Sequence, residues 1–130
     1  MLTFIIGGAR SGKTALAQSL CPPDSRVAYL ATLQAEDDEM RQRVRRHRSS
    51  RPAPWCTIEE PLAIAATVRR AASDFDFIVL DCLTLWLSNF CWAHRDYDAE
   101  QLERGVLAEA EDLACACGNA HLIVVSNEVG

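Results

Sequence analysis

The segment GGARSGKT, at residues 7–14, contains the residue types that bind a nucleoside triphosphate. It matches the pattern G-x-x-x-x-G-K-[ST], and its fixed positions are Gly7, Gly12, Lys13 and Thr14. Glycines let backbone N–H groups turn toward a phosphate, and a following helix adds its positive N-terminal end. We expect Lys13 to reach the β- and γ-phosphates and the Thr14 hydroxyl to ligate Mg²⁺. The alternative is a glycine-rich turn with an incidental lysine, but the strand-like run before it and the helical composition after it favour the phosphate-binding loop.

A phosphate-binding loop also needs an acidic side chain near the Mg²⁺, and Asp81 is the candidate. It ends the apolar run FIVLD (77–81), the place of a Walker B aspartate. An alternative is that Asp81 caps a helix after the strand, and the two roles are compatible. Glu128 follows the apolar run LIVVSN in the same way, with a weaker signal. Both carboxylates are expected at the carboxyl edge of a parallel sheet, where ligands bind.

The segment MRQRVRRHRSSRP (40–52) places six arginines around His47 in a chain whose net charge is −5. If this segment is helical, His47 lies on one stripe with Met40 and Val44, toward the body of the protein. One reading is a core histidine with a satisfied hydrogen bond. The sharper reading is that the arginines lower the pKa of His47, keep it neutral and bind a triphosphate. Attack of His47 on phosphorus would then give a phosphoramidate intermediate.

A further reading of the arginines is a helix that binds nucleic acid. The acidic balance of the chain and the lack of interleaved aromatic residues make this reading weaker. The other two histidines, His94 and His121, have no supporting neighbours, so we expect them to be structural.

Length and composition predict one domain, residues 1–130, with a core that needs no disulfide or metal. The most apolar stretch, 75–93, contains Asp76 and Asp81 and is a poor membrane span. Six cysteines include one close pair, C-A-C at 115–117, without zinc-finger spacing. We therefore expect reduced, mostly buried thiols in a cytoplasmic protein with no tightly bound cofactor.

The elements that must position these residues alternate between strands and helices. Short apolar runs predict strands over 2–6, 26–32, 75–81 and 121–128, and the first of them is expected to be buried. Helical patterns cover 13–20, 37–48, 58–73, the apolar segment after 81, and 98–117, with a loop around Pro52 and Pro54. This order predicts an α/β fold with a mostly parallel sheet and helices on both faces.

Five segments together resemble the bifunctional adenosylcobinamide kinase / adenosylcobinamide-phosphate guanylyltransferase family of cobalamin biosynthesis. They are GGARSGKT, YLAT, DDEMRQRVRRHRSSRP, DCLTLWLSN and VSNEVG, and their order and spacing match from Phe4 to Gly130. The first is common to many NTPases, whereas the HR..RP and NEVG elements are particular to this family. The resemblance implies a P-loop NTPase-like fold.

The resemblance implies two reactions. The first phosphorylates adenosylcobinamide with GTP or ATP, and the second transfers GMP from GTP to the resulting phosphate through a GMP-histidine intermediate on His47. Mg²⁺, held by Thr14 and Asp81, is expected to accompany the nucleotide. The substrates are GTP, ATP, adenosylcobinamide and its phosphate; a homo-oligomer fits the family, and nucleic acid is not expected. The family's nucleotide contacts fall on Gly7, Gly8, Ala9, Arg10, Ser11, Gly12, Lys13, Thr14, Ala31, Thr32, Leu33, Arg48, Ser49, Ser50, Arg51, Glu59 and Asp81.

Glu59 has a second possible role, and the end of the chain suggests an incomplete sheet. Read without the resemblance, Glu59 is a helix-start acid before Pro61. Family members continue past NEVG with a helical segment and a final strand, so this chain is expected to leave its sheet incomplete and one edge open. Weak nucleotide binding or inactivity of the shorter chain is one consequence of that expectation.

Two alternatives to the bifunctional enzyme stay open at this point. One is a simple P-loop small-molecule kinase in which His47 is structural. The other is a regulatory P-loop protein whose arginine helix binds nucleic acid.

Overall fold

A parallel β-sheet forms the centre of the molecule. The computed structural model describes residues 1–8, 12–33 and 55–127, and everything said below about structure concerns these residues. The strands are β1 (Leu2–Gly7), β2 (Val27–Ala31), β3 (Trp55–Glu59), β4 (Phe77–Asp81) and β5 (His121–Asn127). Their spatial order is β1-β5-β4-β2-β3, and every neighbouring pair is parallel. The predicted mostly parallel α/β fold is therefore confirmed.

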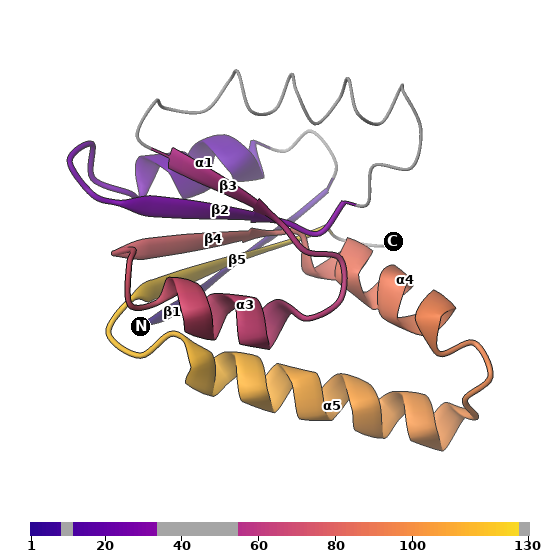
Figure 1. Ribbon diagram of the computed structural model, residues 1–130. Helices are drawn as coiled ribbons and strands as arrows, with labels where there is room; N and C mark the ends of the chain where they lie inside the picture. Colours follow the sequence, from indigo (N-terminus) through magenta and orange to yellow (C-terminus); the bar gives the residue numbers. More distant parts are fainter. Residues whose placement is uncertain (9–11, 34–54, 128–130) are drawn as a thin grey trace.

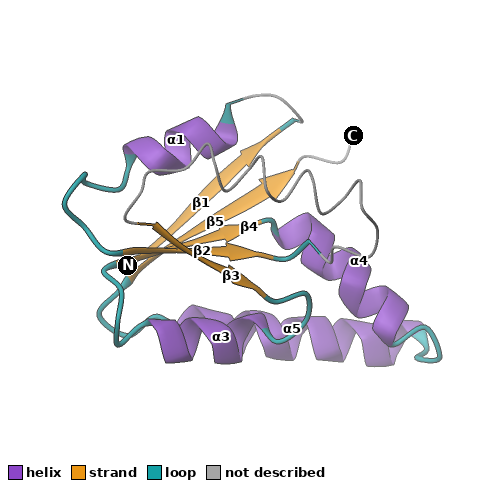
Figure 2. Cartoon of the chain, turned by 45° about the horizontal axis from the view of Figure 1, so that its top comes forward, coloured by secondary structure: helices purple, strands orange, loops and turns teal. Residues whose placement is uncertain are grey.

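Helices cover both faces of the sheet. Helix α1 (Lys13–Ser19) lies on one face, and α3 (Ile64–Ala71) and α5 (Ala99–Ala116) lie on the other (Figures 1 and 2). Helix α4 (Leu83–Ala93) begins directly after β4. A reciprocal capping box between Asp98 and Gln101 starts α5, and Gly118, at φ 52°, follows its end. The helix predicted over 37–48 lies outside the described residues.

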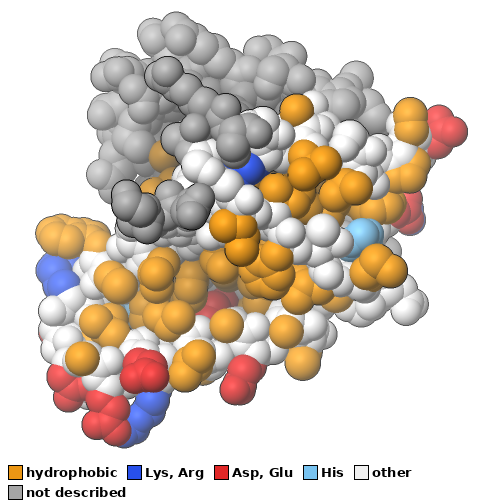
Figure 3. All heavy atoms as spheres, turned by 180° about the vertical axis from the view of Figure 1, so that it is seen from behind, with side chains coloured by type: hydrophobic (Ala, Val, Ile, Leu, Met, Phe, Trp, Pro, Cys, Tyr) orange, Lys and Arg blue, Asp and Glu red, His pale blue; other side chains and the backbone are white. Residues whose placement is uncertain are grey.

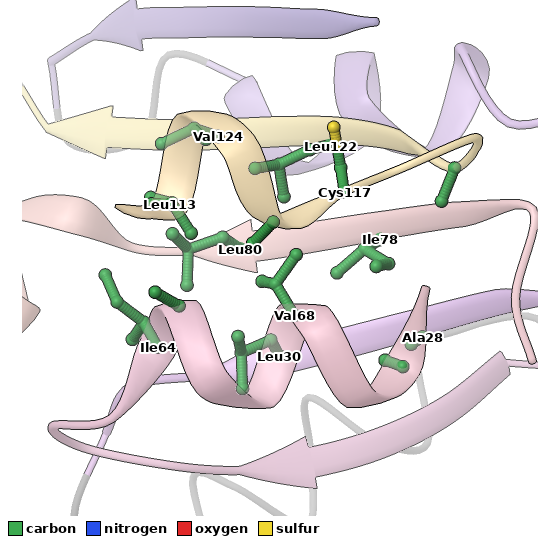
Figure 4. Close-up of a cluster of buried hydrophobic side chains, with 14 of the residues drawn as sticks. Ala28, Leu30, Ile64, Val68, Ile78, Leu80, Leu113, Cys117, Leu122 and Val124 are labelled. Carbon is green, nitrogen blue, oxygen red and sulfur yellow. The ribbon is translucent and has the colours of Figure 1, made fainter. Parts of the chain in front are cut away.

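Two apolar clusters fill the space between the sheet and its helices. The larger joins alternate residues of β2, β4 and β5 to α3 and α5; its labelled members in Figure 4 include Leu30, Val68, Leu80, Leu113 and Leu122. The smaller lies under α1 and contains Ala17, Tyr29 and Ile123. The strands in the middle of the sheet are apolar on both faces because helices cover both sides.

Strand β1 differs from its prediction, because it is an edge strand and not a fully buried one. It pairs only with β5 in the described part of the chain. Ile5 faces α1 and is buried, whereas Phe4 and Ile6 are 52% and 69% exposed. Leu2 and Phe4 line a cavity of about 430 Å³ against α4 and α5, and apolar side chains gather on this side of the molecule (Figure 3). The apolar run was read correctly as a strand, but its composition did not tell an edge from the centre of the sheet.

Strand β3 is the element that sequence reasoning missed. The residues WCTIE were divided between a loop and the start of a helix, but they form a short strand beside β2. Helix α3 consequently begins at Ile64 and not at Ile58. β3 is an edge strand whose side chains are only partly buried, so it lacked the continuous apolar signal of β4 and β5.

The cysteines are free, as expected, but they are not mostly buried. Cys21, Cys82 and Cys117 are buried, while Cys56, Cys91 and Cys115 are exposed. Burial raises the pKa of the Cys21 thiol to about 11 and also raises the pKa of Cys82. The two groups of thiols should therefore differ in reactivity, because the thiolate is the reactive form.

We predict that brief alkylation of the folded chain with iodoacetamide at pH 7.5 modifies Cys56, Cys91 and Cys115 first. Cys21 and Cys82 should react much more slowly, because they are buried and protonated. Peptide mass spectrometry measures each site, and the same reaction in denaturant is the control, in which all six should react at similar rates. Early modification of Cys21 in the folded chain would contradict the described packing.

A second prediction concerns the larger core cluster. Leu122 is fully buried in β5, so Leu122→Ala should lower the free energy of unfolding by about 2–5 kcal/mol. Leu107→Ala is the matched control, because Leu107 is 53% exposed on α5; it should change stability by less than about 0.5 kcal/mol. Denaturant unfolding followed by circular dichroism measures both, and equal losses would mean that Leu122 is not a core residue.

Candidate functional site

The carboxyl ends of all five strands lie along one edge of the sheet. Ala31 of β2 is in register with both Glu59 of β3 and Asp81 of β4. On the other side, Asp81 pairs with Val125 of β5, and Gly7 of β1 pairs with Asn127. The register therefore places the start of the phosphate-binding loop on the same edge as the predicted acids, where open parallel sheets bind ligands.

The phosphate-binding segment leads from β1 into α1, as its motif predicts. Gly7 ends β1, Gly8 follows, and Gly12 precedes α1 at φ 84°. This left-handed backbone conformation favours glycine. Lys13 is the first residue of α1, and its Nζ donates to the Gly8 carbonyl oxygen over 2.5 Å. Lys13 thus folds back along its own loop, and Thr14 is the next residue of α1.

Asp81 ends β4 and receives a hydrogen bond from the hydroxyl of Tyr29 on the adjacent strand β2. The alternative role of Asp81 as a helix N-cap is wrong. The N-cap of α4 is Cys82, whose Sγ accepts the Leu85 N–H at 3.4 Å. The Asp81 carboxylate therefore belongs to the strand end, held from one side by a phenol, and not to the helix start.

Thr32 ties the end of β2 to the segment after β4. Its backbone N–H donates to the Asp81 carbonyl at 3.1 Å. Its hydroxyl donates to the Cys82 carbonyl at 2.8 Å and accepts the Cys82 N–H at 3.0 Å. Thr32 is fully buried, so these bonds satisfy polar groups that water cannot reach. Thr32, which was predicted to contact the nucleotide, thus also holds β2 and β4 together. Its neighbours Ala31 and Leu33 are partly exposed.

Glu59 is the last residue of β3 and its side chain is exposed. Reading Glu59 as a helix-start acid is wrong, because Glu59 belongs to β3 and α3 begins only at Ile64. The Glu60 carboxylate accepts the N–H groups of Leu62 and Ala63, each at 3.0 Å, just before α3. Glu59 lies at the carboxyl edge in register with Ala31, and its contact with the nucleotide stays a prediction.

Two side chains at this edge were missed by sequence reasoning. Tyr29 lies within a strand, and only the pairing of β2 with β4 brings it to Asp81. Asn89 of α4 donates to the carbonyl oxygens of Thr32, at 2.8 Å, and Pro61, at 3.1 Å. A polar amide within an apolar helix, as in LTLWLSNF, was the one available signal.

Several predicted residues lie outside the described part of the chain. They are Ala9, Arg10 and Ser11 of the phosphate-binding loop, His47 with Arg48, Ser49, Ser50 and Arg51, and Glu128. The described edge brings together Gly7, Gly8, Ala31, Glu59 and Asp81, with Gly12, Lys13 and Thr14 entering α1 beside it. The nucleophile prediction for His47 stays a prediction.

The other two histidines have the structural contacts expected of them. His121 Nε2 is hydrogen-bonded to the Thr3 hydroxyl at 2.7 Å. Partial burial, followed by the charge of the N-terminus, lowers the pKa of His121. His94 packs between Phe90 and Tyr97, with ring centroids 4.4 and 4.6 Å away.

Comparison with known proteins identifies the family to which the chain belongs. A family model described as cobinamide kinase / cobinamide phosphate guanyltransferase matches residues 3–130. The chain belongs to this family. The resemblance found in the sequence motifs is thereby confirmed, and the family match agrees with a glycine-rich loop and an acid at one edge of a parallel sheet.

Curated relatives from this family align along the whole chain. The bifunctional adenosylcobalamin biosynthesis protein CobP of Pseudomonas aeruginosa is 44% identical over 133 residues, covering 100% of this chain and 73% of that protein. The bifunctional adenosylcobalamin biosynthesis proteins CobU of Escherichia coli and Salmonella typhimurium are 33% and 34% identical over 138 residues, covering 100% of this chain and 76% of each. Family membership therefore rests on the full set of elements and not on the phosphate-binding loop alone.

The described residues contain neither a membrane-spanning helix nor a resident metal cluster. Among them, no helix is long and apolar enough to cross a membrane. They also hold no group of three or more His, Cys, Asp or Glu side chains that could bind a metal ion.

We predict that Thr32→Val lowers the free energy of unfolding by about 1–3 kcal/mol, because it leaves the buried Cys82 N–H without its acceptor, the Thr32 hydroxyl. Thr67→Val is the control. Thr67 is also buried, but the carbonyl that its hydroxyl binds, that of Ala63, already accepts the Thr67 N–H. Denaturant unfolding should show a clearly larger loss for Thr32→Val, and equal losses would contradict the tie between β2 and β4.

Proposed function

We propose that this protein is an adenosylcobinamide kinase and adenosylcobinamide-phosphate guanylyltransferase of cobalamin biosynthesis. The observation that carries the proposal is the register of the sheet edge, which aligns Asp81 with Ala31 and Glu59 in a chain of the cobinamide kinase / guanyltransferase family. The names of the curated relatives support the same function. The substrates are GTP or ATP together with adenosylcobinamide and its phosphate.

The first reaction is a phosphoryl transfer at the γ-phosphorus. The hydroxyl oxygen of adenosylcobinamide attacks the γ-phosphorus of GTP or ATP. The bond to the β–γ bridging oxygen breaks, GDP or ADP leaves, and the hydroxyl proton passes to water. The backbone of the phosphate-binding loop, with Gly7, Gly8 and Gly12, cradles the phosphates, and Lys13 neutralises developing charge. Lys13 rests on the Gly8 carbonyl in the described structure, so this mechanism requires it to exchange that contact for phosphate oxygens.

The second reaction is a transfer of GMP in two displacements. A ring nitrogen of His47 attacks the α-phosphorus of GTP, and pyrophosphate leaves. A phosphate oxygen of adenosylcobinamide phosphate then attacks the same phosphorus, the P–N bond breaks, and His47 is regenerated. The arginines beside His47, including Arg48 and Arg51, would bind the phosphates and keep the ring neutral. Ala31, Thr32, Leu33 and Glu59 are the proposed nucleotide contacts at the sheet edge, with Ala9, Arg10, Ser11, Ser49 and Ser50 beyond the described residues.

Mg²⁺ is the expected companion of the nucleotide. Thr14 and Asp81 supply a hydroxyl and a carboxylate, and hard oxygen ligands of this kind suit Mg²⁺, which usually takes one or two protein ligands plus substrate phosphates. The Tyr29 hydroxyl donates to Asp81 and would orient its carboxylate. When bound, the ion neutralises charge on the phosphate oxygens.

The proposal also covers the cellular location and the oligomeric state of the enzyme. Free cysteines without disulfides suit a cytoplasmic enzyme. The enzyme is further proposed to form a homo-oligomer and to bind no nucleic acid. Tight, steeply salt-dependent binding to nucleic acid would instead favour a regulatory P-loop protein.

We predict that the protein incubated with α-labelled GTP and Mg²⁺ acquires a covalent label that is acid-labile and base-stable, the signature of a phosphoramidate. His47→Asn should abolish the label and retain kinase activity. His94→Asn is a matched control, because His94 packs between two aromatic rings and should leave labelling unchanged.

The outcomes of this experiment separate the proposed function from its alternatives. No label on wild type, or equal label on His47→Asn, would refute the histidine mechanism and leave a simple kinase. Lys13→Ala should weaken nucleotide use in any P-loop protein, so it tests the phosphate-binding loop and does not discriminate between these functions.

A further inference from the structure

Asn89 of α4 joins two loops that the sheet itself leaves separate. β2 and β3 are paired up to Ala31 and Glu59, and the last backbone bond between their ends runs from the Glu60 N–H to the Ala31 carbonyl at 2.9 Å. Beyond that bond, the Asn89 amide nitrogen donates to Thr32 after β2 and to Pro61 after β3, at 2.8 and 3.1 Å. Both protons of one amide group are therefore used to hold two loops together.

The chemistry of its partners fixes the orientation of this amide. Carbonyl oxygens only accept hydrogen bonds, so the NH₂ end of Asn89 must face both of them. An aspartate of the same shape would present oxygens to both carbonyls and would have no proton to donate when ionised. Asn89 is thus a position where a nearly isosteric substitution removes the interaction without removing volume.

A second bond from α4 supports only one of the two loops. Trp86, one turn before Asn89, donates its indole N–H to the Leu62 carbonyl at 2.8 Å. Trp86 is buried, and it contacts the loop after β3 without touching the loop after β2 through a hydrogen bond in the described structure. It therefore serves as a comparison, since it attaches the same helix to a neighbouring carbonyl but does not join the two loops.

We infer that Asn89 is a positioning residue for the nucleotide, because it fixes the separation of the β2 and β3 loops at the sheet edge. This inference rests on the proposed function, in which Ala31, Thr32, Leu33 and Glu59 contact the nucleotide. Because the two loops are already held at this spacing, less conformational entropy is lost when the nucleotide binds. Asn89 does not itself reach the reacting atoms.

The test compares Asn89→Asp, Asn89→Gln and Trp86→Phe with the wild-type protein. Asn89→Asp should raise the KM for GTP about tenfold with kcat nearly unchanged, as expected for lost binding worth about one hydrogen bond. Asn89→Gln keeps both amide protons and should recover most of this loss. Trp86→Phe keeps an aromatic ring, loses its N–H bond, and should leave the KM for GTP within about threefold of wild type.

Hydrogen exchange tests the joining of the loops without any nucleotide. In the nucleotide-free protein, Asn89→Asp should speed amide exchange in both 31–33 and 60–63, whereas Trp86→Phe should affect 60–63 alone. An unchanged KM for GTP in Asn89→Asp, or a loss of equal size in Trp86→Phe, would overturn the inference. Failure of wild type to use GTP, or full activity of Lys13→Ala, would instead overturn the proposed function, so the two failures are distinguishable.

Discussion

Parallel pairing of β4 with β2 on one side and β5 on the other is the constraint on which the site depends. Residues at the ends of five strands, scattered from Gly7 to Asn127, become neighbours only because the strands are parallel and in register. A slip of one residue would turn Asp81 to the opposite face of the sheet, away from the Tyr29 hydroxyl that binds it. The hydrogen bonds that Tyr29 makes to Asp81 and that Thr32 makes to the Cys82 backbone favour the observed register.

Beyond the last backbone hydrogen bonds of the sheet, side-chain hydrogen bonds hold the ends of the strands together. Thr32 binds both polar groups of the Cys82 backbone, and Asn89 holds the carbonyls that follow β2 and β3. These are hydrogen bonds to buried or partly buried groups, which are costly to leave unmade. The edge is therefore rigid close to the sheet, and such pre-organisation lowers the entropy cost of holding a flexible triphosphate.

Sequence reasoning succeeded where a local pattern determines the outcome. The glycines and lysine of residues 7–14 specify a turn into a helix, and the apolar runs of β2, β4 and β5 specify buried strands. It failed for β3, which is short and half-exposed, and for the burial of β1, because edge and centre strands share the same residue types. It also missed Tyr29 and Asn89, whose partners are 52, 57 and 28 positions away, and such contacts depend on topology and not on local pattern.

The phosphate-binding loop follows β1, which is one of the two edge strands of the described sheet. β1 has one strand neighbour, β5, and on its inner face Ile5 packs in the cluster that contains Ala17 and Cys21 of the α1 region. Its outer face, with Phe4 and Ile6, is largely exposed. Since Lys13 already bonds to the Gly8 carbonyl, phosphate bound by this loop would link β1 and α1 through the same few residues. A ligand that binds only the folded loop stabilises the fold, so nucleotide binding and the stability of this edge are thermodynamically coupled.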